Sequence, residues 1–159
     1  MITTELYAKI EGFIPRELSC GWDNDGLSVL PDPEHESGKV LVALDVREEV
    51  VEYAKKNGFD TVLTHHPLIF SGLKELSGRT VVSSKAAKLI RAGIAAMSFH
   101  TRFDALDGGV SDITHFIALL TRFRARRISS PACWTAAGRL RIRCSGTGRP
   151  LYSGRTGHP

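Results

Sequence analysis

The chain has 159 residues, of which 42% are hydrophobic and 24% are charged, a composition typical of one soluble domain with a hydrophobic core. No apolar run approaches the ~20 residues that span a bilayer, and the first residues lack the basic flank and apolar core of a secretory signal. We therefore expect a cytoplasmic protein with no membrane partner.

The net charge of +4 hides two regions of opposite charge. Residues 1–112 contain 12 basic and 17 acidic residues, a net charge of −5, whereas residues 113–159 contain nine arginines and no lysine, aspartate or glutamate. This abrupt change predicts a domain at 1–112 and a separate Arg-rich tail at 113–159. We interpret the tail as an out-of-frame translation, with a disordered extension as the alternative. A basic arm for nucleic acid is not favoured, because few aromatic residues accompany the arginines.

Helical and strand patterns alternate along the first region. The expected caps are Thr3 or Thr4 for the first helix and Ser83 or Ser84 for the last. The alternation predicts an α/β fold with a mostly parallel sheet flanked by helices. In chain order the predicted elements are a helix at 3–12, a turn-rich loop at 20–27, a strand at 40–45, a helix at 48–56, a strand at 61–66, a pocket-shaping loop at 68–79, a helix at 83–91, a strand at 94–99 and a helix entry at 110–112.

Two segments carry more specific expectations. The continuous apolar run from Val40 to Leu44 is typical of a central parallel strand. The turn-rich loop around Trp22 has two interpretations: either Trp22 pins the loop in the core, or the loop borders a functional site with Asp23 and Asn24.

Polar side chains end three successive strands. Asp45 ends the first, His65 and His66 end the second, and His100 ends the third with Asp104 shortly after it. Because the carboxyl ends of parallel strands meet at one edge of a sheet, we expect these side chains to converge. Imidazole and carboxylate groups together suit Zn, Mn, Fe or a similar divalent ion. The sequence therefore predicts a metal site at this edge, the alternative being strand ends that are only a polar rim.

Residues 3–112 resemble a known family. The resemblance covers four blocks that occur in the same order: Trp22 to Leu27, Val40 to Asp45, Thr64 to Phe70, and His100 to Asp112. The chain is similar here to the type 2 GTP cyclohydrolase I homologues, which are dinuclear-metal-centre proteins related to the Ngg-interacting-factor-like proteins.

The resemblance implies a ligand set and an assembly. It makes His65, His66 and Asp104 ligands of a two-metal site and leaves Asp45 and His100 as candidates for supporting or proton-transfer roles. In the family, a further histidine and glutamate near the C-terminus complete the site. No acidic residue follows Asp112, so the domain at 1–112 is incomplete relative to the family. Members typically form homohexamers.

The implied activity is hydrolysis by hydroxide generated at divalent metal ions. The substrate would be a small molecule or nucleotide, and the family reaction opens the guanine ring of GTP to give formate and dihydroneopterin triphosphate. The alternatives are a metal-binding or scaffold protein without turnover and a truncated, inactive family member. Arg102 departs from the family pattern by adding a cation next to the site, where it would either bind a substrate phosphate or repel metal.

Overall fold

The structure is a computed structural model that describes residues 1–114, 143–144 and 150–151. Its centre is a four-stranded sheet with the order β1-β4-β3-β2. Strands β2, β3 and β4 are parallel to one another, and β1 pairs with β4 in the antiparallel direction. The predicted α/β fold with a mostly parallel sheet is therefore confirmed. The strands are β1 Gly26–Val29, β2 Val40–Ala43, β3 Thr61–Thr64 and β4 Ala95–Ser98.

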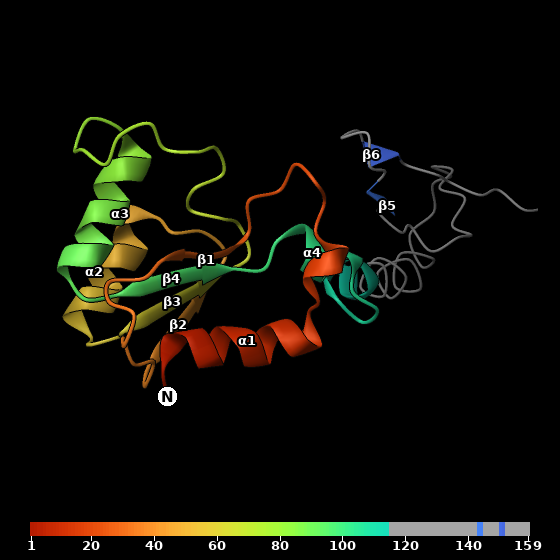
Figure 1. The fold of residues 1–159 in the computed structure, drawn as a ribbon, viewed down its shortest axis with the longest axis horizontal. Helices are drawn as coiled ribbons and strands as arrows, with labels where there is room; N and C mark the ends of the chain where they lie inside the picture. Colours follow the sequence, from red (N-terminus) through yellow and green to blue (C-terminus); the bar gives the residue numbers. More distant parts are fainter. Residues whose placement is uncertain (115–142, 145–149, 152–159) are drawn as a thin grey trace, which may run out of the picture.

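Helices cover both faces of this sheet (Figure 1). Helices α2 (Glu48–Lys56) and α3 (Val81–Arg91) lie on one face, and α1 (Thr3–Phe13) lies on the other. The side of α2 and α3 holds the main hydrophobic core, where side chains of the helices meet those of the strands. Its fully buried members include Val51, Ala54, Val62, Ala86, Leu89 and Ala96.

Helix α1 packs on the opposite face through both polar and aromatic contacts. The Thr3 hydroxyl is within 2.7 Å of the Ser37 hydroxyl, which in turn lies 2.6 Å from that of Thr61. The Tyr7 ring stacks on Phe99 with a centroid distance of 5.6 Å. Because alternate residues of a strand face opposite sides, Thr61 is linked to α1 through Ser37, whereas Val62 enters the main core.

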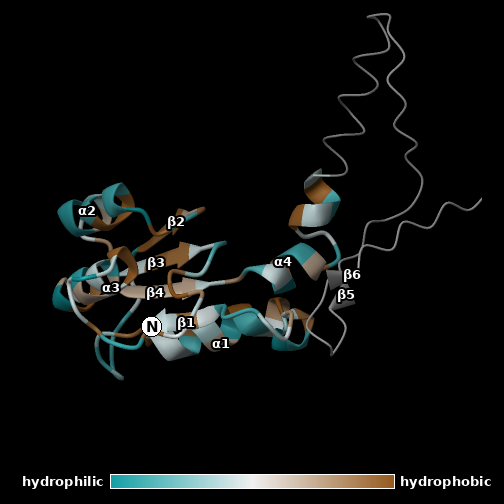
Figure 2. Cartoon of the chain, turned by 90° about the horizontal axis from the view of Figure 1, so that it is seen from above, coloured by the Kyte–Doolittle hydropathy of each residue, from teal (hydrophilic) through white to brown (hydrophobic). Residues whose placement is uncertain are grey.

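Strand β2 differs from its prediction as a central strand. It is an edge strand in the described part of the chain, and Val42 is 71% exposed. Leu41 packs against the core while Val42 does not, and β2 is brown, the hydrophobic end of the scale, in Figure 2. An apolar run shows what kind of surface a strand presents on each face, but it does not reveal which strands lie beside it. The prediction of a central strand was therefore wrong.

Several short elements and caps also differ from the expectation. The strand β1 and the short helices η1 (Arg16–Leu18) and α4 (Thr101–Ala105) were not predicted. Helix α1 is capped by Ile2 without a side-chain hydrogen bond. Helix α3 begins earlier than expected, because Thr80 and Ser83 form a capping box at its start. Residues 110–114 are helical, in agreement with the predicted helix entry.

Little of the Arg-rich tail lies within the described residues. Two short strands, β5 (Arg143–Cys144) and β6 (Pro150–Leu151), pair in the antiparallel direction. The rest of residues 115–159 lies outside the described part, so the interpretation of the tail stays a prediction. No helix in the described residues has both the length and the apolar character needed to cross a bilayer.

Candidate metal centre

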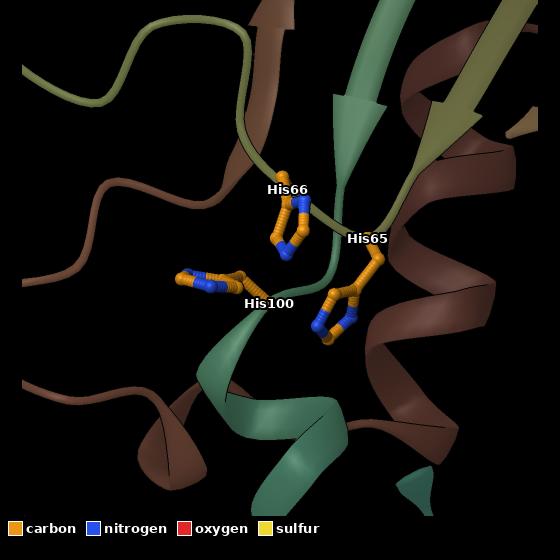
Figure 3. A group of neighbouring side chains, drawn as sticks. All are labelled: His65, His66 and His100. Atoms are coloured by element: carbon orange, nitrogen blue, oxygen red, sulfur yellow. The ribbon is translucent and has the colours of Figure 1, made fainter. Parts of the chain in front are cut away.

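Three histidines meet at the carboxyl edge of the sheet (Figure 3). His65 and His66 directly follow β3, and His100 follows β4 after one residue. Strands β3 and β4 are parallel, with Thr64 paired to Ser98, so their ends lie side by side. One nitrogen from each of the three imidazoles lies within 4.8 Å of the others. We call His65, His66 and His100 the histidine cluster.

Each histidine of the cluster has a carboxylate beside it. His66 Nδ1 is 2.7 Å from Asp45 Oδ1, and His100 Nδ1 is 3.0 Å from Asp23 Oδ1. His65 Nε2 is 3.6 Å from Asp104 Oδ1, which is an ion-pair distance rather than a hydrogen bond. The three carboxylates come from the loop after β2, the loop before β1 and helix α4.

The protonation states of these groups suit a cation site. A hydrogen bond from His66 lowers the pKa of Asp45. Burial raises the pKa of Asp23, but hydrogen bonds from Thr101 and His100 outweigh it and leave the pKa lowered. Burial lowers the pKa of His65, since a low-dielectric environment disfavours the charged imidazolium. At neutral pH, His65 is therefore neutral and offers a free lone pair.

The donor set fits a divalent transition metal ion. Neutral imidazoles with nearby carboxylates are the ligands preferred by Zn, Mn and Fe. The carboxylates on His66 and His100 resemble the partners that hold metal-binding histidines in place. Nδ1 of His65 is buried, and the imidazole also interacts with the backbone of Phe99, a contact that raises its pKa without outweighing burial.

The structure brings together all five residues predicted from the strand ends. His65 and His66 lie in the cluster, with Asp104 and Asp45 beside them as described above. His100, expected in a supporting role, lies among the potential ligands. That these residues bind metal stays a prediction.

The loop before β1 contributes to the site through Asp23, which the sequence raised only as one of two interpretations. Trp22 is 40% exposed and lies near the rings of Phe70 and His100, so it does not pin the loop in the core. Asn24 donates a hydrogen bond to the carbonyl of Ile69, which ties this loop to the one after β3. The sequence signal was the dense group of acidic and amide residues after Trp22.

Arg102 has neither of the roles considered for it. Its side chain is fully buried, and its guanidinium donates to Asp25 at 2.7 Å and to Glu11 at 2.9 Å. It also donates to the Tyr7 hydroxyl at 2.9 Å. Two carboxylates thus balance the charge, and Arg102 joins α1 to α4 instead of facing a substrate phosphate or a metal. Sequence position alone could not show that its long side chain turns into the interior.

A cavity of about 710 Å³ is formed by the loop after β3. Leu68, Phe70, Leu73 and Val82 are among its lining residues, together with Lys74 and Thr80. Phe70, one of these lining residues, also has its ring centroid 6.4 Å from that of His100. The loop at 68–79 therefore shapes a pocket, as predicted.

Known proteins are similar to this chain in sequence and in fold. A sequence model of Duf34/NIF3 (NGG1p interacting factor 3) matches residues 1–142. The chain belongs to this family. This confirms the resemblance inferred from the sequence motifs.

Individual relatives match only part of their own length. The chain is 41% identical over 103 residues to the GTP cyclohydrolase 1 type 2 homolog of Clostridium perfringens, covering 65% of this chain and 39% of that protein. It is 38% identical over 112 residues to the homolog of Lactococcus lactis, covering 70% and 43%. The crystal structure of Staphylococcus aureus protein SA1388 superposes with a TM-score of 0.68 at 32% identity, covering 74% and 33%. The chain thus spans about two-fifths of the curated relatives named here.

Proposed function

We propose that this chain binds divalent metal at the histidine cluster and that the site serves metal-dependent hydrolysis. The observation that carries the proposal is the approach of three imidazoles to within 4.8 Å at the end of parallel strands. His65, His66 and His100 would act as ligands, with Asp104 as the carboxylate ligand beside His65. Zn, Mn and Fe are the candidate metals, and two ions per chain is the arrangement implied by the family.

The protein groups around the site prepare it for this role. A bound divalent ion would supply a Lewis acid and make a water-derived nucleophile available at neutral pH. Asp45 accepts a hydrogen bond from Nδ1–H of His66, which would leave Nε2 of that ring for metal. Asp45 is one-third exposed, so it is also placed to exchange a proton with solvent or substrate.

We propose a nucleotide as the substrate and ring-opening hydrolysis of GTP as the reaction. Support comes from the bacterial relatives, which are named GTP cyclohydrolase 1 type 2 homologs. Support also comes from the cavity formed by the loop after β3, where Leu68 and Phe70 offer apolar surface to a planar ring, and from the ring contact between Phe70 and His100. The products would be formate and dihydroneopterin triphosphate.

The second candidate is a metal-binding or scaffold protein without turnover. It is favoured by the donor set of the histidine cluster, because three histidines and a carboxylate suffice to bind an ion, whereas turnover also needs groups that bind and orient a substrate. An inactive family member is the limiting case of this candidate.

Metal content and GTP turnover together test these proposals. We expect two divalent ions per chain by elemental analysis and formate release from GTP, with both reduced by His66→Ala. The control is His35→Ala, which removes a histidine bonded to Thr3 and Gly93 instead of the cluster. Bound metal without activity on any nucleotide would contradict the hydrolase and support the second candidate. Less than one ion per chain would contradict both.

We also propose a homohexameric assembly, a cytoplasmic location and an out-of-frame origin for residues 113–159. The proposed origin of the tail rests on the loss of lysine, aspartate and glutamate after Asp112. Light scattering of the purified protein measures the oligomer. Gene sequencing across codons 113–121 tests the tail, and an uninterrupted frame with a detected tail peptide would contradict its proposed origin.

A further inference from the structure

The carboxylate of Asp23 is buried and uses both of its oxygens. Its side chain is 0% exposed, and its Oδ1 accepts a hydrogen bond from the backbone N–H of Asn24 at 2.8 Å. Its Oδ2 accepts from the backbone N–H of Thr101 at 3.1 Å and from the Thr101 hydroxyl. That hydroxyl itself accepts from the N–H of Cys20 at 3.0 Å, so its own proton is directed to Asp23.

These contacts determine which nitrogen of His100 carries the proton. Nδ1 of His100 lies 3.0 Å and 3.1 Å from the two oxygens of Asp23. Three other donors point at these oxygens, namely the N–H groups of Asn24 and Thr101 and the Thr101 hydroxyl. Such contacts favour the ionised carboxylate, which only accepts, so Nδ1 is the donor. With the proton on Nδ1, the lone pair of the neutral ring is on Nε2.

A second carboxylate of the same loop holds the backbone at this point. Asp25 Oδ2 accepts from the backbone N–H of His100 at 3.2 Å and from Nε of Arg102 at 2.7 Å. Asp25 therefore acts on the main chain at the start of α4, whereas Asp23 acts on the imidazole ring. The loop before β1 thus controls both the position and the proton of His100, which lies 75 residues after Asp25 and 77 after Asp23.

We propose that Asp23 is the positioning residue that holds His100 as its Nδ1–H tautomer and thereby presents Nε2 to a divalent metal ion. This inference rests on the proposed metal site but makes a separate statement about the metal-free protein. It assigns to Asp23, from a loop distant in sequence, the role that Asp45 has for His66.

Nitrogen-15 NMR of histidine-labelled, metal-free full-length protein tests the tautomer directly. We expect a pyrrole-type shift for Nδ1 and a pyridine-type shift for Nε2 of His100, assigned by comparison with His100→Gln. In Asp23→Asn, the amide N–H can donate to Nδ1, so we expect His100 to shift toward its Nε2–H tautomer. A wild-type ring protonated on Nε2, or an unchanged His100 in a folded Asp23→Asn, would overturn the proposal.

Two control variants separate positioning from general loss of structure. Asp45→Asn should alter the shifts of His66 and leave the His100 tautomer unchanged. Asp60→Asn removes a carboxylate that caps the N–H groups of Gly38 and Lys39, and it should leave both rings unchanged. If Asp23→Asn does not fold, the wild-type spectrum alone still decides the tautomer.

Cobalt(II) binding, followed by visible absorption, links the tautomer to the metal. We expect Asp23→Asn to weaken Co²⁺ affinity about 10–100-fold, the range for partners that orient metal-binding histidines, and Asp60→Asn to leave it unchanged. Equal affinity in wild type and Asp23→Asn would contradict a positioning role. Absence of Co²⁺ binding by the wild type would instead contradict the proposed function, while the NMR result would stand.

Discussion

At the scale of single residues, the site and the residues that hold it in place consist of oppositely charged or hydrogen-bonded pairs. Arg102 is buried between Asp25 and Glu11, and each histidine of the cluster lies beside one aspartate. Buried charges are tolerated only when they are paired and hydrogen-bonded. Glu11 of α1 and Asp25 of the loop before β1 therefore balance the buried charge of Arg102. Asp23 of the same loop pairs with His100.

Glu11 makes this coupling measurable through pH. Burial raises its pKa, but hydrogen bonds from Arg102 and Tyr7 outweigh burial and leave the pKa lowered. A carboxyl whose pKa is lower in the folded state stabilises the protein fully above its unfolded pKa of ~4.3, and this contribution is lost as the pH falls through the folded pKa. Glu11→Gln should therefore lower the free energy of unfolding at pH 7 more than at pH 3.

Urea unfolding of Glu11→Gln and wild type at both pH values provides the measurement. The matched control is Glu5→Gln, which removes an exposed carboxylate from the same helix. A difference between Glu11→Gln and wild type that is equal at pH 7 and pH 3 would show that the ionised form of Glu11 does not contribute.

At the scale of elements, the residues of the histidine cluster lie in the segments that follow the strands and not in the strands themselves. One of these segments, the pocket loop, leads into helix α3, where the Thr80 hydroxyl accepts a hydrogen bond from the N–H of Ser83 at 3.1 Å. The Ser83 hydroxyl contacts the Thr80 N–H in return at 3.4 Å. This capping box starts the helix beside the cavity, and Thr80 is also a lining residue.

Two neighbouring substitutions distinguish the observed cap from the one expected from sequence. Thr80→Ala removes the capping oxygen and should lower the free energy of unfolding by about 1 kcal/mol. Ser84→Ala, at the second position expected from sequence, should change it by less than ~0.5 kcal/mol because alanine favours a helix. Thermal or urea unfolding measures both variants, and equal effects would place the cap elsewhere.

At the scale of the whole molecule, burial is uneven across the sheet. The face covered by α2 and α3 contains fully buried side chains such as Leu89 and Val62, whereas Val42 on the edge strand β2 is 71% exposed. Stabilisation by burial follows the apolar area removed from water. The core beside α2 and α3 therefore determines the stability of the described domain far more than the edge at β2.

This contrast predicts a large loss of stability for a substitution at one hydrophobic position and a small effect at another. Leu89→Ala creates a cavity in the core and should lower the free energy of unfolding by about 2–5 kcal/mol. Val42→Thr changes an exposed side chain and should alter it by less than ~0.5 kcal/mol. Chemical denaturation of the isolated chain gives both values. A large effect of Val42→Thr at low protein concentration would show that Val42 is covered in solution.

The sequence predicted most of the elements and the grouping of the site, since both follow from local patterns. Apolar runs that end in Asp45, in His65 and His66, and in His100 required only the rule that parallel strands end at one edge. Strand β1 was missed because it directly follows a dense turn signal, and α4 because it has five residues. Tertiary contacts stabilise these elements more than their own propensities do.

By itself, therefore, the sequence determined the α/β class, the family and the meeting of histidines and carboxylates at one edge of the sheet, because periodicity, motifs and the residues that end each strand are local properties. Only the tertiary structure decided that Arg102 turns inward to Asp25 and Glu11, that β2 lies at the edge, and that Asp23 holds His100. These outcomes depend on contacts between residues up to 91 positions apart, where side-chain direction and charge pairing are set by packing.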